Sequence, residues 1–306
     1  MGTPLVSEQF GDLLEPGLRK IYDDVYKEPD DPIGMLYNVS TSSTSYEKDS
    51  QVGSIGDLED FDATGQIQYD DVVQGYDTQY NHKQYTKGFK VERKLYDDDL
   101  YGIINKKPRA LAIAVKRTVD KHKAQPLNEA FSAAGTVYMT GMDGLSLCNN
   151  AHTSTYPSGY TNIDNAGSTA LSATSVEATR RLMVKWTDDR GNLISVVPDT
   201  IIVPRALEET GWVIISSRGK VDSSDNNPNF HQGKYKLIVS DRLNDSNNWF
   251  MIDSGLCKLM LNFFMRIPPE FAQDKDFDTL IAKFRIYTRY SLGWSDWRWI
   301  YGHNVA

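Results

Sequence analysis

The sequence predicts an α+β fold, and three stretches carry the prediction. Apolar residues recur at helical spacing over 97–131, and aromatic residues alternate with polar ones over 66–93. Two extended apolar segments lie between 259 and 290, as expected for long strands. With 306 residues, the chain can bury a substantial core as one large domain or two.

The stretch 97–131 is the longest predicted helix. Leu111, Val115 and Val119 fall on one of its faces, and the three aspartates at 97–99 provide the negative charge that a helix N-terminus favours. Pro108 removes an internal hydrogen bond, so we expect a kink or a second helix that starts there. A rod of about 50 Å, at about 1.5 Å per residue, should lie along a surface or a subunit boundary.

The chain before this helix predicts an arm followed by strands. A short amphipathic helix within residues 1–30 should dock on another part of the fold or on a neighbouring chain, through an apolar face that includes Phe10, Leu14 and Leu18. Residues 28–66 are rich in Ser, Thr, Gly and Asp, which predicts a weakly packed arm, loop or linker. Residues 66–93 predict long strands with one poorly buried face, with breaks at glycines 75 and 88 and at Asn81.

Tyrosines in and near these strands are suited to an interface. Large side chains with two torsion angles lose little entropy when they form contacts. The predicted contacts between subunits from this part of the chain are Tyr69, Tyr76, Tyr80 and Tyr85.

The remainder of the chain predicts a block of mixed helices and strands, here called the mixed block, and two closing strands. In the block we expect a helix over 172–190, capped by Ser172 or Thr174 and ended by Gly191. A buried strand over 200–203, a helix after Pro204 and strands near 236–240 and 249–253 should follow. An acidic turn over 268–278 should separate the two C-terminal strands, and the helix at 97–131 is their expected partner.

The overall charge bounds the possible functions. A net charge of −8 and a pI near 5.2 argue against a protein that coats nucleic acid through bulk electrostatics.

Cys148 and Cys257 are far apart, so we expect free thiols in a reducing compartment. The sequence has neither an apolar run of about 18 residues nor a signal-peptide pattern, and we expect a soluble protein made in the cytoplasm, without membrane partners.

One charge asymmetry is clear, because the long helix is basic within an acidic protein. Two interpretations stay open: pairing with the acidic stretches 56–61 or 274–278 of the same or a neighbouring chain, or contact with a polyanion. Lys116 and Arg117 are predicted subunit contacts on this face. The basic residues are Lys106, Lys107, Arg109, Lys116, Arg117, Lys121 and Lys123.

Catalytic and metal-binding signals are weak. Ser146 and Cys148 share a loop with His152, but without a G-x-S-x-G elbow a plain polar loop is favoured, and we expect His152→Ala to leave assembly intact. The histidines lack metal-ligand spacing, and the aspartates at 97–99 are interpreted as a helix cap. The DDRGN segment at 188–192 lacks a full set of calcium ligands and is interpreted as a helix stop. We expect no catalytic residue, cofactor or metal.

A series of segments in a fixed order resembles a known family. The series runs from QYDDVVQGYDTQYNHKQYTKGF through GFKVERKLYDDDLYGIINKKPRALAIAVKRTV to DGLSLCNNAH, PDTIIVPRALEETG, KLIVSDRLNDSNNWFMID and SLGWSDWRWIYGH. The chain is similar in these segments to tailed-phage major capsid proteins of the Hong Kong 97-type fold, in particular to the major head subunits of Mu-like phages. The resemblance covers about residues 30–306.

This resemblance implies a domain organisation. It implies an N-terminal arm at 1–40 and an extended loop with its returning strand at 41–93. A peripheral domain would comprise 94–144 and 258–306, with a spine helix at about 97–131, and an axial domain would comprise 145–257.

The resemblance also implies an assembly function rather than catalysis. Identical chains would form pentamers and hexamers that build an icosahedral shell around double-stranded DNA, as a structural protein of the virion assembled in the host cytoplasm. Further implied partners are portal, scaffold and decoration proteins. With only about 30 residues before the arm, we expect a separate scaffold protein or a short leader that is trimmed.

The sequence leaves three alternatives to a major capsid protein open. An encapsulin-like nanocompartment shell shares the fold but packages enzyme cargo. A soluble hydrolase would use Ser146 or Cys148 with His152. A ring-forming tail or adaptor protein would assemble into tubes or single rings.

Overall fold

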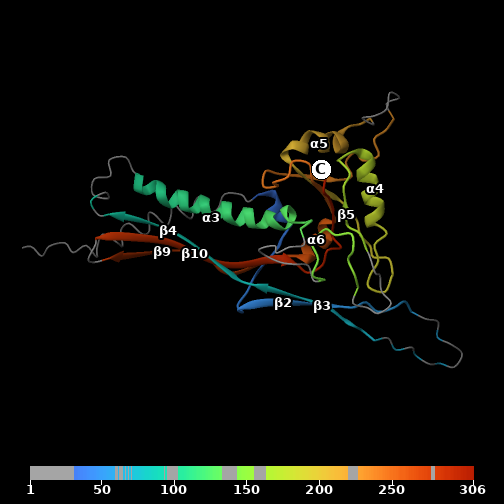
Figure 1. Cartoon of the computed structure of the whole chain (residues 1–306), viewed down its shortest axis with the longest axis horizontal. Helices are drawn as coiled ribbons and strands as arrows, with labels where there is room; N and C mark the ends of the chain where they lie inside the picture. Colours follow the sequence, from blue (N-terminus) through green and yellow to red (C-terminus); the bar gives the residue numbers. More distant parts are fainter. Residues whose placement is uncertain are drawn as a thin grey trace, which may run out of the picture.

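The computed structural model describes residues 31–58, 61, 65, 67, 69, 71–92, 94, 103–132, 143–154, 163–219, 227–276 and 280–306. Figure 1 shows an elongated molecule in which a long helix lies on a sheet, a mixed block stands at one end, and a hairpin projects away from both. The predicted amphipathic helix within 1–30, with Phe10, Leu14 and Leu18, lies outside the described residues. The predicted aspartate cap at 97–99 lies outside them as well.

A four-stranded sheet forms the elongated part. Its order is β1–β9–β10–β4, with β1 parallel to β9 and the other neighbours antiparallel. The bounds are β1 (Asn38–Thr41), β4 (Lys83–Glu92), β9 (Leu261–Asp276) and β10 (Ile281–Trp294).

The predicted turn over 268–278 is wrong, because β9 continues through it to Asp276. Buried Phe271 pairs with Ile286 in the ladder and stacks near Phe284, so this segment belongs to the sheet core. The ladder register shifts between Tyr287 and Arg289, opposite the two prolines at 268–269. Such an irregularity accommodates residues that lack an N–H donor.

Helix α3 (Ile103–Asn128) packs along this sheet, as predicted. It is one continuous helix, so a second helix starting at Pro108 is wrong. Its apolar face is the predicted one, since Leu111 and Val115 are buried. The cluster between α3 and the sheet comprises Val91, Leu111, Ala112, Val115, Phe271, Phe284 and Ile286.

A second sheet of five strands organises the mixed block, in the order β5–β11–β8–β6–β7. The predicted strands near 200–203, 236–240 and 249–253 are confirmed, and every residue of β6 and β8 is buried. The bounds are β5 (Ala166–Gly167), β6 (Thr200–Pro204), β7 (Lys236–Ser240), β8 (Trp249–Ile252) and β11 (Ile300–His303).

Helices α4 (Ala173–Met183), α5 (Glu208–Ser216) and α6 (Ser254–Met260) belong to the same block. Ser172 caps α4 as predicted, and its hydroxyl accepts the N–H of Ser175 in a capping box. The predicted end at Gly191 is wrong, since the helix ends at Met183. The helix cannot continue to Gly191, because the Asp188 carboxylate accepts the N–H groups of Arg190 and Asn192 and folds this segment into a turn.

The segment before the long helix is more ordered than its composition predicts. Residues 28–66 contain the 3-10 helix η1 (Pro32–Leu36), strand β1 and strand β2 (Tyr46–Val52). These polar strands form because distant strands provide their ladder partners: β9 pairs with β1, and β3 (Gln74–Asn81) pairs with β2.

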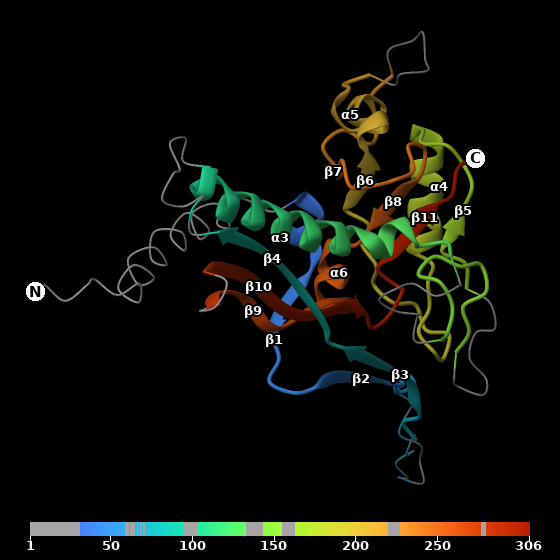
Figure 2. The same cartoon turned by 60° about the vertical axis from the view of Figure 1, so that its left-hand side comes forward.

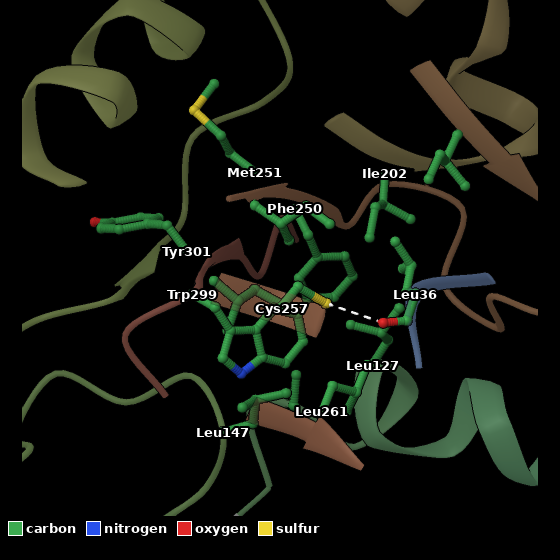
Figure 3. Packing of buried hydrophobic residues seen from close by; sticks show 14 of the residues in the cluster. Leu36, Leu127, Leu147, Ile202, Phe250, Met251, Cys257, Leu261, Trp299 and Tyr301 are labelled. Carbon is green, nitrogen blue, oxygen red and sulfur yellow. Dashed lines mark hydrogen bonds between the residues drawn. The ribbon is translucent and has the colours of Figure 1, made fainter. Parts of the chain in front are cut away.

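One apolar core joins the sheets and helices. Figure 3 shows Leu36 of η1, Leu127 of α3 and Trp299 before β11 converging around Cys257, and the Cys257 thiol faces the Leu36 carbonyl at 3.7 Å. Both cysteines are free and buried, as the sequence predicts. Burial raises the pKa of the Cys257 thiol and of the Cys148 thiol well above the ordinary range, so both are unreactive at neutral pH.

Candidate functional site: an extended hairpin and its clasp

Strands β2 and β3 form an antiparallel hairpin that projects from the molecule. Their register runs from Tyr46 opposite Asn81 to Val52 opposite Gln74. Figure 2 shows the hairpin leaving the side of the four-stranded sheet that faces away from α3. The hairpin therefore extends beyond the core that folds the rest of the chain.

The segment that connects β2 to β3 exposes large apolar side chains. Leu58 is 100% exposed and Tyr69 is 91% exposed. A group of exposed apolar residues of this size marks an interaction site, because water contact with apolar surface is unfavourable. The exposed apolar residues of this segment are Ile55, Leu58, Phe61, Ile67, Tyr69 and Val72.

The same segment is uniformly acidic. In the sequence, residues 53–73 contain six Asp or Glu residues and no Lys, Arg or His. A surface that combines exposed apolar groups with negative charge fits a partner that is apolar and basic. The hairpin therefore has the composition of a binding element.

A clasp from the turn after α4 holds the hairpin where its paired strands end. The Asp189 carboxylate accepts the Ser54 hydroxyl at 2.6 Å and the Ser54 N–H at 3.1 Å. The Arg190 guanidinium donates to the carbonyl of Ser54 at 2.7 Å and to the carbonyl of Asp71 at 2.8 Å. Both strands of the hairpin are thus tied to the mixed block through charge-assisted hydrogen bonds.

Further contacts hold the paired strands of the hairpin at both ends. The Tyr76 hydroxyl lies 3.1 Å from the Thr153 hydroxyl. The Tyr80 hydroxyl donates to Asp49 at 3.0 Å, and its ring packs on Phe264 with 5.0 Å between centroids. The hairpin is consequently attached at its root and at its clasp, while its connecting segment is exposed.

The predicted contact residues of the hairpin strands differ in their exposure. Tyr69 is exposed on the hairpin, and Tyr76 is half-buried near the end of the paired strands that adjoins the clasp. Tyr80 is only 1% exposed, so the prediction that it contacts a neighbouring subunit is wrong: its ring fills the core of its own chain. Alternation alone could not show that Tyr80 faces β9 rather than solvent.

Other predicted contacts lie on or near α3. Tyr85 is half-buried, because it stacks on Tyr290 at 4.7 Å and lies 4.8 Å from the His122 ring. Arg117 is exposed, and Lys116 is half-buried. The structure does not bring these residues together with the hairpin of the same chain.

The loop with the candidate nucleophiles Ser146 and Cys148 has a packing role, because its polar groups are bonded within the fold. The Ser146 hydroxyl donates to the Cys148 carbonyl at 3.0 Å instead of approaching His152. The two ring nitrogens of His152 contact Asp143 at 2.6 Å and Asn165 at 3.1 Å, and its ring stacks on Trp297 at 4.3 Å. Neither nitrogen is available to activate a nucleophile.

The hydrogen bonds of His152 are fixed on one side by Asn165. The Asn165 amide nitrogen donates to the carbonyls of Leu147 and Ile300, so its oxygen is the atom that faces His152 and accepts a hydrogen bond from Nε2. The Nδ1 atom on the other side of the ring forms a buried hydrogen bond with the Asp143 carboxyl group. These hydrogen bonds hold the loop against the C-terminal segment.

The sequence pattern does not predict the role of Asp189 and Arg190 at the hairpin. As a helix stop their DDRGN segment has a local function, and the structure adds a second role as the clasp. The available signal was two adjacent opposite charges in a turn. Nothing in their spacing identifies Ser54 as the partner, 135 residues away.

Two negative findings apply to the described residues. There, no group of three His, Cys, Asp or Glu side chains is arranged to hold a metal ion. Within the same residues, no helix is long and apolar enough to cross a membrane.

Comparisons with solved structures agree with this architecture. The Mycobacterium phage Che8 structure shares 15% identity, with 90% of this chain and 91% of that chain covered and a TM-score of 0.53. The capsid of bacteriophage JBD30, decorated with minor capsid protein trimers, shares 13% identity over 71% of this chain and 92% of that chain, with a TM-score of 0.57. The capsid of a native GTA particle shares 11% identity, with 90% of this chain and 89% of that chain covered and a TM-score of 0.54.

No curated protein sequence matches the chain. Residues 75–302 match a family model described as phage capsid protein. This match covers well over half of the chain and includes α3, strands β4, β9 and β10 of the four-stranded sheet, and nearly all of the five-stranded sheet. The chain therefore belongs to the phage capsid protein family, and it is a major capsid protein with the Hong Kong 97-type fold.

Proposed function

We propose that the chain forms pentamers and hexamers that tile a closed icosahedral shell around the double-stranded DNA of a tailed phage. The exposed hairpin is the observation that carries this proposal. Its apolar, acidic connecting segment projects beyond the chain's own core and gains burial only on a neighbouring subunit. Many identical hairpin contacts would close the shell.

The domain organisation fits this proposal. Residues 41–93 serve as the extended loop, and 1–40 as the N-terminal arm. Residues 94–144 and 258–306 form the peripheral domain, whose spine helix is α3, while 145–257 form the axial domain around the symmetry axes. Tyr69 and Tyr76 on the hairpin, and Phe10, Leu14 and Leu18 in the arm, are proposed subunit contacts.

Proposed partners beyond the chain itself are portal and scaffold proteins. A decoration protein is a further candidate, since the JBD30 capsid carries minor capsid protein trimers. A particular relationship of this chain to the major head subunits of Mu-like phages stays a prediction. Assembly in the host cytoplasm also stays a prediction.

Electron microscopy of purified particles tests the proposal. We expect curved shells that contain genome-length DNA and a portal at one vertex. Uniform small shells filled with a protein cargo would support an encapsulin-like compartment instead. Open tubes or single rings would support a tail or adaptor protein, and a stable monomer with hydrolase turnover that depends on His152 would support an enzyme.

Deletion of residues 51–65 tests the hairpin directly. This segment includes Leu58 and the clasped Ser54, but it contributes little to the core. We expect a folded subunit with wild-type far-UV circular dichroism that fails to assemble or forms shells of lower denaturant resistance. Normal particles of wild-type resistance would contradict the role of the hairpin. Leu58→Ser is the smaller variant, and it should weaken assembly without affecting the thermal midpoint of the subunit.

A further inference from the structure

A line of exposed basic residues runs along α3. Lys106, Arg109, Arg117 and Lys121 are exposed, and half-exposed Ile113 lies between them. Spacings of three or four residues place all five on one face of the helix. Between Lys106 and Lys121 the line extends about 22 Å, at about 1.5 Å per residue. We name these four basic residues the basic line.

The basic line is an excess of positive charge within an acidic protein. The protein has a net charge of −8, yet α3 contains seven Lys or Arg and a single acidic residue, Asp120. Asp120 is buried and faces Arg242 at 3.8 Å. Within the described residues, no ion pair joins any member of the line to an acidic side chain.

Other lysines of α3 differ from the line, because they are used within the fold. The Lys123 ammonium lies 5.0 Å from the Phe263 ring centroid, and this residue is buried. The Lys107 ammonium lies 5.7 Å from the Phe89 ring centroid. These two have an intramolecular role through cation–π contact, and no such contact is seen for the basic line among the residues that the structure describes.

The basic line and the hairpin lie on opposite sides of the four-stranded sheet. The apolar face of α3 packs on the sheet, so the line points away from it. Figures 1 and 2 both show β2 and β3 leaving on the other side. In the proposed shell, a hairpin overlaps its neighbour on the hairpin side. The α3 side then forms the opposite shell surface, out of reach of the acidic hairpin of a neighbour.

We propose that the α3 side of the subunit faces the shell interior and that the basic line binds the phosphate backbone of the packaged double-stranded DNA. Duplex DNA presents about one negative charge per 1.7 Å of its axis, so four cations over about 22 Å meet many phosphates. Contact of this kind requires no base recognition and tolerates any packaged sequence. The inference rests on the proposed function, because it needs a shell filled with DNA.

Labelling of intact filled particles tests which side faces inward. Arg117→Cys places a thiol in the line. Gln84→Cys and Lys90→Cys place thiols at separate points of β4, on the sheet face away from α3, because side chains alternate along the strand and Phe89 and Val91 point towards α3. Native Cys148 and Cys257 are buried and give no background. The reagent is a maleimide attached to a polymer too large to pass the shell.

We expect Gln84→Cys or Lys90→Cys to react on intact particles and Arg117→Cys to react only after the shell is opened. Reaction of Arg117→Cys on intact particles would overturn the inference, as would failure of both β4 thiols. If the wild-type chain formed no filled shells, the proposed function would fail, which is a separate result.

Cross-linking tests the contact itself and uses the wild-type protein. Formaldehyde should join Lys106 and Lys121 to DNA in filled particles and give no such adducts in empty shells. Adducts of these lysines to a scaffold protein or a neighbouring subunit, without DNA adducts, would overturn the inference.

A charge-matched pair of variants completes the test. Arg109→Gln with Arg117→Gln removes two charges from the line, and Lys90→Gln with Arg285→Gln removes two from the other side of the sheet. We expect both variants to form shells, and the DNA adducts of Lys106 and Lys121 to fall several-fold only in the first. An equal fall in both variants would contradict a local contact.

Discussion

The carboxylate of Asp189 accepts hydrogen bonds from both the hydroxyl and the backbone N–H of Ser54, a residue 135 positions earlier in the chain. Arg190 completes the contact by donating to the carbonyls of Ser54 and Asp71. The clasp fixes the far end of the paired strands relative to the mixed block. The exposed connecting segment is therefore anchored to the mixed block by hydrogen bonds as well as by its own strands.

Loss of the clasp should weaken assembly more than folding. Asp189→Ala removes charge-assisted hydrogen bonds with a value of about 1.5–3 kcal/mol, but these hold only the hairpin. We expect faster amide hydrogen exchange in peptides from residues 46–58 and lower shell yield, with a subunit thermal midpoint close to wild type. Glu209→Ala, on the exposed side of α5, is the matched control and should change neither. Unchanged exchange in Asp189→Ala would show that the clasp does not hold the hairpin.

Removal of the His152 ring should destabilise the subunit, while the sequence-based expectation that assembly stays intact remains a prediction. His152→Ala leaves the buried Asp143 carboxyl group and the Asn165 amide oxygen without a hydrogen-bond partner, and an unsatisfied buried polar group costs about 1–3 kcal/mol. We expect a lower urea midpoint. The double variant with Asp143→Asn should recover part of the loss, because no buried carboxyl group is left without a partner. A wild-type midpoint for His152→Ala would contradict the buried hydrogen bonds.

Gly302 should not tolerate a side chain. A Cβ at this position would lie 2.7 Å from the Cys148 sulfur and 2.9 Å from the rings of Phe131 and Phe250, all closer than packed atoms approach. Gly302→Ala should therefore lower the free energy of unfolding by about 1–3 kcal/mol, through overpacking. The control is Gly255→Ala, where the nearest atom is 3.3 Å away. Chemical denaturation of both variants measures the difference, and equal midpoints would refute the close packing.

Acid should destabilise the subunit through buried histidines. Desolvation, with smaller contributions from Lys121 and Lys83, lowers the pKa of His122 to about 4 from its ordinary 6.5. Between those values the unfolded chain binds more protons than the folded one, so stability is present above pH 6.5 and is lost as the pH falls towards 4. His122→Gln should lose less stability than wild type between pH 7 and 4.5, as measured by urea midpoints. An equal loss would exclude His122 as a source.

The acid effect should extend to His303 in β11. Burial lowers its pKa to about 4, and the ring stacks on Trp249 at 4.1 Å while it bonds to the Thr179 hydroxyl at 2.8 Å. The sign is the same as for His122: stability is lost below pH 6.5. Titration of the ring by NMR should show an apparent pKa well below 6.5. A value at or above 6.5 would contradict this prediction.

Elements with strong local patterns could be predicted from the sequence. The spacing of Leu111 and Val115 identified both α3 and its buried face, and Ser172 identified the start of α4. The short apolar strands β6 and β8 were also predicted, because their residues are apolar throughout and buried on both faces.

Elements that depend on distant partners could not be predicted. Strand β2 is polar along its length, and only its pairing with β3 orders it. Pro268 and Pro269 favour a turn locally, yet they lie within β9 because Phe271 packs in the core beyond them. The clasp of Asp189 and Arg190 onto Ser54 is a contact of this type, since no local pattern links a turn to a partner 135 residues away.

Interior positions of both sheets are filled by the last strands that the ribosome makes. Strands β9 and β10 separate β1 from β4 in the four-stranded sheet, and β11 separates β5 from β8 in the five-stranded sheet. A nascent chain that has not reached residue 261 therefore has no template on which β1 or β4 can pair. Translation products that stop before residue 261 can complete neither sheet.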